Sequence, residues 1–158
     1  GGMNQRVLIA SSMITSPTVL IADEPTKGLD YALRDDVMQE LSDIKHQNSS
    51  SLLLITHDFD LSRRVADRTA IMYAGEILEI APTSSFFHEP LHPYSRALLR
   101  SLPENGFQPI PGPPVAMSDQ PTGCKFHPRC PKKQSICSER TPPSITLDKR
   151  EIRCFLYA

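Results

Sequence analysis

The sequence lacks the features that would place it in a membrane or on a nucleic acid. No apolar stretch approaches the roughly 20 residues of a membrane-spanning helix, and no stretch has the pattern of a secretory signal peptide. Neither sign of charge dominates, because 17 Lys and Arg residues balance 18 Asp and Glu residues for a net charge of -1. No basic run stands out, so nothing indicates a nucleic-acid partner. Internal repeats and low-complexity segments are also absent.

Cysteine is absent from the first part of the chain, and proline is rare there. All four Cys residues lie from Cys124 onward, and most of the 15 Pro residues lie beyond Pro82. The 158 residues are enough for one domain with a core. The shift in composition nevertheless predicts two parts, residues 1–82 and residues 83–158. The sequence begins with Gly1 rather than Met, so we expect that it is truncated.

The stretch that ends at Pro25 predicts a buried strand with two acidic residues at its end. Four apolar residues, Val19 to Ala22, are typical of a strand buried on both faces of a parallel sheet. Pro25 has no N–H to continue the ladder, so the strand should end before it. Asp23 and Glu24 then lie at the carboxyl end of the strand, where open α/β sheets bind ligands. One carboxylate could hold Mg²⁺ while the other polarises a water for attack on phosphate, or the strand could simply end in an acidic loop.

The residues that follow predict a strand–helix–strand unit. Apolar positions at spacings of four, four and three indicate an amphipathic helix from Tyr31 to Gln47, and Asp30 is placed to cap it. A second apolar run, Leu52 to Ile55, predicts another buried strand, which ends in Thr56-His57-Asp58. Such a crossover sets the two strands parallel. His57 should therefore face the same ligand as Glu24, although a surface histidine is the simpler interpretation of His57 alone.

The remaining elements are predicted from shorter patterns. An apolar helix is expected at 7–15, closed by Pro17, and the two glycines before it could present backbone N–H groups to an anion. Short helices are expected at 59–66, 83–89 and 95–100. A hairpin is expected at 68–80, around Ala74-Gly75. After Pro103 the sequence is interpreted as mostly loop.

Taken in order, these motifs resemble the second half of an ATP-binding-cassette (ABC) ATPase. The segment Gly1 to Arg6 resembles the end of the signature motif, and Val19 to Glu24 resembles Walker B with its catalytic glutamate. Gly28-Leu29-Asp30 resembles the D-loop, and Thr56-His57-Asp58 resembles the switch histidine. The resemblance implies an α/β fold in which a partial P-loop NTPase parallel sheet with flanking helices is followed by a small, irregular, Pro/Cys-rich C-terminal extension.

Roles for single residues follow from the same resemblance. Asp23 would coordinate Mg²⁺, mostly through water, and Glu24 would act as general base on the attacking water. His57 would contact the γ-phosphate of ATP and sense its presence. The family sandwiches two ATP molecules between two cassettes, so further residues would contact nucleotide or the subunit interface across that dimer. These residues are Gly1, Gly2, Gln5 and Asp30.

One motif of the family is missing from the sequence. No Gly-x-x-x-x-Gly-Lys-Ser/Thr loop occurs anywhere, and no Leu-Ser precedes Gly1 to complete the signature motif. The cradle for the β- and γ-phosphates and its lysine are therefore absent. We expect the intact parent to be the ATPase, and the chain alone to bind ATP weakly and not to hydrolyse it.

His92-Pro93-Tyr94 and the cysteine-bearing tail resemble the extension of the oligopeptide/dipeptide importers, the peptide and nickel branch of the family. The resemblance implies a parent that couples ATP hydrolysis to import of short peptides or a related solute, at the cytoplasmic face of the membrane. Its implied partners are a second ABC ATPase subunit, transmembrane permease subunits and, indirectly, an extracytoplasmic solute-binding protein, but no nucleic acid. The alternatives are a soluble ABC ATPase that acts on nucleic acid or ribosomes, and a stand-alone metal-binding or interaction module.

Four cysteines in the tail suit a metal site, namely Cys124, Cys130, Cys137 and Cys154. Their spacing differs from that of a zinc ribbon, and a reducing cytosol disfavours disulfides. The pattern resembles the four-cysteine [4Fe–4S] site of some peptide-importer ATPases, with zinc and with free or oxidised thiols as alternatives. His127 is either a substitute ligand or a neighbour. We expect the site to be structural, because the tail has little apolar core of its own.

Overall fold

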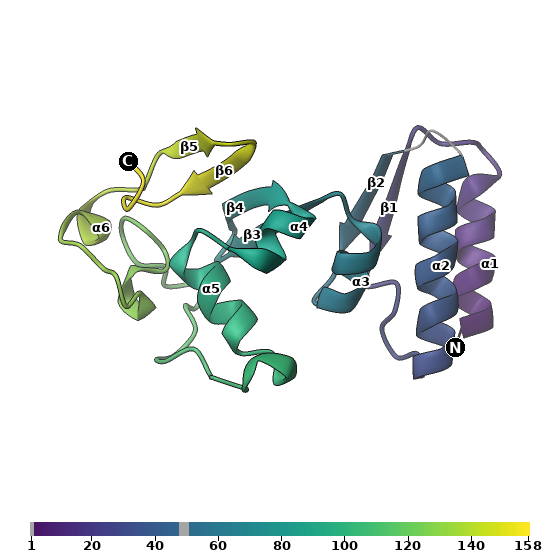
Figure 1. Ribbon diagram of the computed structural model, residues 1–158, viewed down its shortest axis with the longest axis horizontal. Helices are drawn as coiled ribbons and strands as arrows, with labels where there is room; N and C mark the ends of the chain where they lie inside the picture. Colours follow the sequence, from purple (N-terminus) through teal and green to yellow (C-terminus); the bar gives the residue numbers. More distant parts are fainter. Residues whose placement is uncertain (1, 48–50) are drawn as a thin grey trace. The chain divides into compact units, whose positions relative to one another are not determined.

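The computed structural model describes residues 2–47 and 51–158, which form two compact units (Figure 1). The first unit is Gly1–Ala66 and the second is Asp67–Ala158. The sequence predicted that the hairpin at 68–80 belongs with residues 1–82. In the structure this hairpin belongs to the second unit, because it pairs with a strand close to the C-terminus. Among the helices of the described ranges, none combines the length and the apolar character needed to cross a bilayer.

The first unit contains a two-stranded parallel sheet and three helices. Strands β1 and β2 pair in parallel, from Val19 opposite Ser51 to Asp23 opposite Ile55. Helix α2 lies beside α1 and also contacts α3. The predicted strand–helix–strand unit and the bounds of its helix are confirmed. The elements in chain order are α1 (Gly2–Met13), β1 (Val19–Asp23), α2 (Tyr31–Gln47), β2 (Ser51–Ile55) and α3 (Phe59–Val65).

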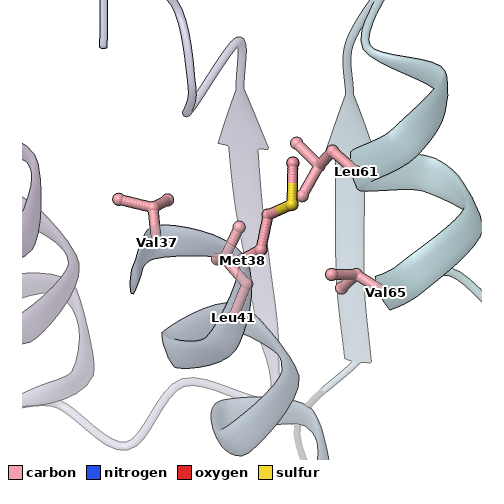
Figure 2. Close-up of a cluster of buried hydrophobic side chains, with 5 residues drawn as sticks. All are labelled: Val37, Met38, Leu41, Leu61 and Val65. Carbon is pink, nitrogen blue, oxygen red and sulfur yellow. The ribbon is translucent and has the colours of Figure 1, made fainter. Parts of the chain in front are cut away.

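The core of this unit lies between its helices and one face of the sheet. Leu41 and Leu61 are fully buried, and full burial of such a side chain stabilises the fold by about 1.5–3 kcal/mol. Partly buried residues from both strands, including Ala22 and Leu54, pack against this cluster. Figure 2 shows its five buried side chains, which come from α2 and α3: Val37, Met38, Leu41, Leu61 and Val65.

The prediction that both strands are buried on both faces is wrong for the described residues. Alternate side chains of a strand point to opposite faces of the sheet. On the face away from the core, Val19 is 55% exposed, Ile21 62% and Leu53 53%. The described helices cover only the other face, so half of each apolar run is exposed.

Helix α1 also differs from its prediction, because it runs from Gly2 to Met13 rather than over 7–15. Gly2 is its first residue, so Gly2 does not form a loop before the helix. The helix ends early because Pro17 disfavours helical geometry in the residue before it, and Ser16 takes a positive φ of 48°.

The second unit is built on a four-stranded antiparallel sheet with the order β3-β4-β6-β5. The sheet joins the predicted hairpin, β3–β4, to two strands near the C-terminus. Short helices and 3₁₀ turns fill the connections. The elements are β3 (Arg68–Tyr73), β4 (Glu76–Pro82), α4 (Thr83–His88), α5 (Pro93–Arg100), η1 (Pro103–Asn105), η2 (His127–Arg129), α6 (Ile136–Glu139), β5 (Ser144–Leu147) and β6 (Arg150–Arg153).

The interpretation of the chain after Pro103 as mostly loop misses the β5–β6 hairpin. Its turn residues, Asp148 and Lys149, have φ values of 46° and 65°. Two positive φ values in a two-residue connection suit the right-handed twist of a hairpin. Apolar Ile145 lies opposite Ile152 across the two strands. Two apolar residues on either side of an Asp-containing turn were the sequence signal that could have predicted this hairpin.

The expectation that the tail has little apolar core is also wrong. Phe126 is fully buried, and its ring lies 5.4 Å from Tyr73 in an edge-on contact and 5.2 Å from Tyr94, measured between centroids. Buried thiols pack here as small hydrophobic groups, so the tail and the hairpin share one core. Its buried members are Tyr73, Leu78, Cys124, Phe126 and Cys137.

Candidate functional site

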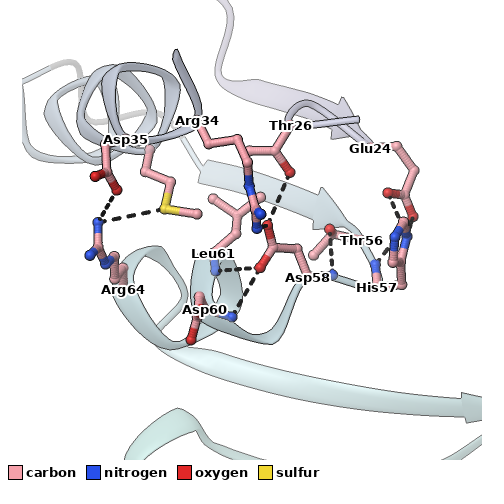
Figure 3. Close-up of polar contacts among 11 residues, drawn as sticks. Glu24, Thr26, Arg34, Asp35, Thr56, His57, Asp58, Asp60, Leu61 and Arg64 are labelled. Carbon is pink, nitrogen blue, oxygen red and sulfur yellow. Dashed lines mark hydrogen bonds and ion pairs between the residues drawn. The ribbon is translucent and has the colours of Figure 1, made fainter. Parts of the chain in front are cut away.

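The structure brings Glu24 and His57 together at the carboxyl end of the parallel strands (Figure 3). The backbone N–H of Glu24 donates to the carbonyl of Ile55 at 2.8 Å, so the pairing of the strands extends past their ends. Glu24 has a positive φ of 46°, which is uncommon for a residue other than glycine. Its carboxylate lies 2.8 Å from Nδ1 of His57 and 3.2 Å from the backbone N of the same residue.

The contact between these side chains defines which nitrogen of the imidazole carries the proton. A carboxylate accepts hydrogen bonds and does not donate them, so Nδ1 of His57 is the donor. In a neutral imidazole, Nε2 is then an acceptor. His57 could donate to a phosphate oxygen only as the doubly protonated ring, or after its contact with Glu24 is broken. The side chain is 81% exposed, whereas that of Glu24 is 29% exposed.

The other predicted site residues of the first unit are Gly1, Gly2, Gln5, Asp23 and Asp30, and not all of them are described. Asp23 is exposed at the end of β1, where its carboxylate is open to a hydrated ion. Asp30 caps α2, because its Oδ1 accepts the backbone N–H of Leu33 at 3.0 Å. Gly1 and the side chain of Gln5 lie outside the described residues.

Asp58 is the main residue of this region that the sequence did not single out (Figure 3). Its Oδ1 accepts the backbone N–H groups of Asp60 and Leu61 at 3.1 and 3.2 Å and thereby caps α3. Its Oδ2 accepts the hydroxyl of Thr26 at 3.2 Å and forms an ion pair with Arg34. The capping role was detectable, since Asp precedes a predicted helix. The contacts with α2 and the loop after β1 had no signal in the sequence.

The charge of Asp58 is stabilised by these partners. Burial alone would raise the pKa of Asp58, but the backbone N–H of Leu61 and the guanidinium of Arg34 outweigh burial, so the pKa lies below its ordinary value. The carboxylate is therefore charged at neutral pH while its side chain is only 10% exposed.

The four cysteines gather in the second unit as free thiols. Burial, and after it the nearby thiols of Cys137, Cys154 and Cys130, together raise the pKa of Cys124 to about 11. Across residues 2–47 and 51–158, no three His, Cys, Asp or Glu side chains are close enough to hold one metal ion. The ring of His127 contacts the backbone carbonyl of Cys124, with Nδ1 2.9 Å from the oxygen. This contact fixes the imidazole of His127 beside the backbone of Cys124.

The His-Pro-Tyr motif begins α5 and is part of a buried polar cluster. His92 is 1% exposed and its Nδ1 accepts the backbone N–H of Tyr94 at 3.0 Å. The carboxylate of Glu79, which is fully buried, accepts the backbone N–H groups of Leu91 and His92 at 2.8 and 2.9 Å. Burial lowers the pKa of His92 to about 4, so the ring is neutral. Sequence reasoning missed Glu79, which lies in an apolar strand with no motif around it.

Solved structures define the class of protein to which this fold belongs. The chain is 27% identical to cbiO1 of Clostridium perfringens, part of the ABC transporter complex cbiONQ, with a TM-score of 0.52 over 65% of this chain and 39% of that one. A metal-chelate type ABC transporter in an inward-facing conformation, 24% identical, has the same fold with a TM-score of 0.54 over 65% of this chain and 39% of that one. The fold is that of part of an ABC ATPase domain.

Sequence relatives narrow the class to one family. Residues 78–137 match the family model described as "Oligopeptide/dipeptide transporter, C-terminal region". The chain is 40% identical to the dipeptide transport ATP-binding protein DppD of Bacillus subtilis, over 99% of this chain and 48% of that protein. It is also 40% identical to the oligopeptide transport ATP-binding protein AppD of the same organism, over 99% of this chain and 50% of that protein.

The chain therefore belongs to the oligopeptide/dipeptide family of ABC transporter ATP-binding proteins. It spans about half the length of the curated relatives it matches.

Proposed function

We propose that the chain is part of an ATP-hydrolysing subunit that powers the import of oligopeptides, dipeptides or a related solute across the cell membrane. The observation that carries this proposal is the contact between Glu24 and His57 at the carboxyl edge of β1 and β2. The similarity to dipeptide and oligopeptide transport ATP-binding proteins over 99% of the chain supports the class of the transported solute.

In this proposal the first unit supplies the hydrolytic half of a composite nucleotide site. Glu24 acts as general base on the attacking water, and His57, whose Nδ1 donates to Glu24, contacts the γ-phosphate through Nε2, which must then carry a second proton. The exposed carboxylate of Asp23 would hold Mg²⁺ through water, and that ion would neutralise charge on the phosphates of ATP. Phosphoryl transfer depends mainly on such positioning and charge neutralisation, and the two strands supply the positioning.

A second ABC ATPase subunit and a loop that this sequence lacks would complete the nucleotide site. Gly1, Gly2 and Gln5 would contact nucleotide held by a second ABC ATPase subunit, and Asp30 would lie at that interface. The phosphate cradle would come from a Gly-x-x-x-x-Gly-Lys-Ser/Thr loop, which this sequence lacks. We therefore propose that these residues alone do not hydrolyse ATP.

We further propose that the four cysteines ligate a [4Fe–4S] cluster rather than a zinc ion. Four thiolates are the usual protein ligands of such a cluster. The thiols of Cys130, Cys137 and Cys154 lie near enough to Cys124 to raise its pKa, so the fold gathers the four candidate ligands in one region. The spacing of the four cysteines also differs from the two close Cys-x-x-Cys pairs of a zinc ribbon.

The partners and location of the whole protein are part of the same proposal. The partners are transmembrane permease subunits, a second ABC ATPase subunit and, indirectly, an extracytoplasmic solute-binding protein, at the cytoplasmic face of the membrane. Residues 1–82 would belong to the nucleotide-binding cassette and residues 83–158 to the importer-specific extension. The match of residues 78–137 to the transporter C-terminal region supports the second assignment.

Hydrolysis by the full-length ATP-binding protein that contains these residues tests the proposal. Glu24→Gln keeps the shape of the side chain but removes the base, so phosphate release should fall about 100-fold or more. Peptide uptake by cells that depend on this system should be lost with it. Unchanged phosphate release in the Glu24→Gln protein would refute the assignment of the general base.

A further inference from the structure

The carboxylate of Asp58 connects three segments of the first unit. Oδ1 binds two backbone N–H groups at the start of α3. Oδ2 binds the hydroxyl of Thr26, in the loop after β1, and the guanidinium of Arg34, on α2. The backbone N–H of Asp58 itself donates to Oγ1 of Thr56 at 3.0 Å. Both oxygens of the carboxylate are therefore used, and each faces a different part of the fold (Figure 3).

The position of His57 depends on these contacts of Asp58, because His57 has few contacts of its own. Its side chain is 81% exposed, and Glu24 is the partner of both its ring and its backbone N–H. The position of an exposed ring is determined by its backbone, and the backbone on either side of His57 is fixed by the contacts of Asp58. Thr26 is 6% exposed and lies two residues after Glu24, so the same carboxylate also fixes the loop that follows Glu24.

We propose that Asp58 is a positioning residue that holds His57 against Glu24 by tethering the loop after β2 to Thr26 and Arg34. The inference rests on the proposed function, because it assigns Asp58 to the geometry of the same nucleotide site. It goes beyond that function by giving the α2 helix a part in hydrolysis, through Arg34.

The two oxygens of Asp58 allow its capping role to be separated from its tethering role. Serine is a good helix cap, so Asp58→Ser keeps an acceptor for the start of α3. It has no second oxygen for Thr26 and Arg34. Arg34→Gln removes the ion pair from the other side and leaves the cap intact. The matched control is Asp35→Asn, which breaks the exposed ion pair of Asp35 with Arg64 at 2.7 Å, also between α2 and α3.

Kinetics of the full-length ATP-binding protein test the effect on hydrolysis. Asp58→Ser and Arg34→Gln should each lower kcat about tenfold, because a small displacement of catalytic groups is costly, while KM for ATP stays within about twofold. The double variant should be no worse than either single variant, since both remove one tether. Asp35→Asn should retain the wild-type kcat.

The tautomer of His57, read from the ¹⁵N NMR shifts of its ring in the 158-residue chain, tests the positioning directly. Wild type should hold the proton on Nδ1, and Asp58→Ser and Arg34→Gln should move it mostly to Nε2. Asp35→Asn should behave as wild type. An unchanged tautomer in Asp58→Ser, or a changed tautomer with an unchanged kcat, would overturn the proposal. If full-length wild type does not hydrolyse ATP, the proposed function fails, and the tautomer still decides whether Asp58 positions His57.

Discussion

Replacement of Glu79 should destabilise the second unit more than replacement of any exposed carboxylate in the same sheet. The side chain is fully buried, and its two oxygens accept the backbone N–H groups of Leu91 and His92. In Glu79→Ala both N–H groups lose their acceptor. Each buried donor left unsatisfied costs about 1–3 kcal/mol, so the free energy of unfolding should fall by about 2–6 kcal/mol. That is a large part of the ~5–15 kcal/mol typical of a folded domain.

Tyrosine fluorescence during urea unfolding can measure this change. Three of the four tyrosines belong to the second unit, and Tyr31, in the first, is 75% exposed, so the signal reports mainly on the second unit. The control is Glu151→Gln, since Glu151 is an exposed neighbour in the sheet with a 3.5 Å ion pair to Arg68. Such pairs contribute about 0–1 kcal/mol. If Glu79→Ala unfolds at the same urea concentration as Glu151→Gln, the carboxylate does not organise the start of α5.

Three further predictions concern pH, catalysis and the thiols. The pKa of His92 is lowered from 6.5 to about 4, so between these values the unfolded chain binds a proton that the folded chain does not, and acidification from pH 7 to pH 4 should lower the free energy of unfolding by about 3 kcal/mol. His92→Asn keeps a helix cap and should remove this contribution to the pH dependence. The argument is contradicted if the urea midpoints of wild type and His92→Asn fall by the same amount between pH 7 and pH 4. Phosphate release by the 158-residue chain should not exceed the buffer background, and turnover abolished by Glu24→Gln would show that the missing cradle is dispensable. Protein purified without oxygen should be brown, with broad absorption in the visible blue that Cys137→Ser removes, whereas a colourless preparation with stoichiometric zinc would reject the cluster.

Sequence patterns predicted the structure correctly where an element depends only on the spacing of neighbouring residues. The apolar period from Tyr31 to Gln47 predicts both ends of α2 correctly, because a helix needs one apolar face regardless of what covers it. Ala74-Gly75 predicts the β3–β4 hairpin because a tight turn needs positive φ values, which are 48° and 80° there. The order of strand, helix and strand also placed Glu24 and His57 at one edge, since a crossover makes the strands parallel.

Local patterns failed where a residue's environment depends on distant segments. An apolar run such as Val19 to Ala22 indicates a strand, but the described helices cover only one of its faces. The β5–β6 hairpin was missed because the strands are short, and their stability comes from pairing with β4 rather than from their own composition.

The sequence by itself determined the family, the order of the elements in the first unit and the two carboxylates at the end of β1, because these depend on residue types at short spacing. Only the tertiary structure decided which charged groups work together. Asp58 and Arg34 are separated by 24 positions in the chain, and Glu79 and His92 by 13. Their hydrogen bonds form because packing of helices and strands buries polar groups from distant segments together. A buried polar group must be hydrogen-bonded within the protein, since water cannot reach it. That requirement ties the loop of His57 to α2 and the His-Pro-Tyr motif to β4.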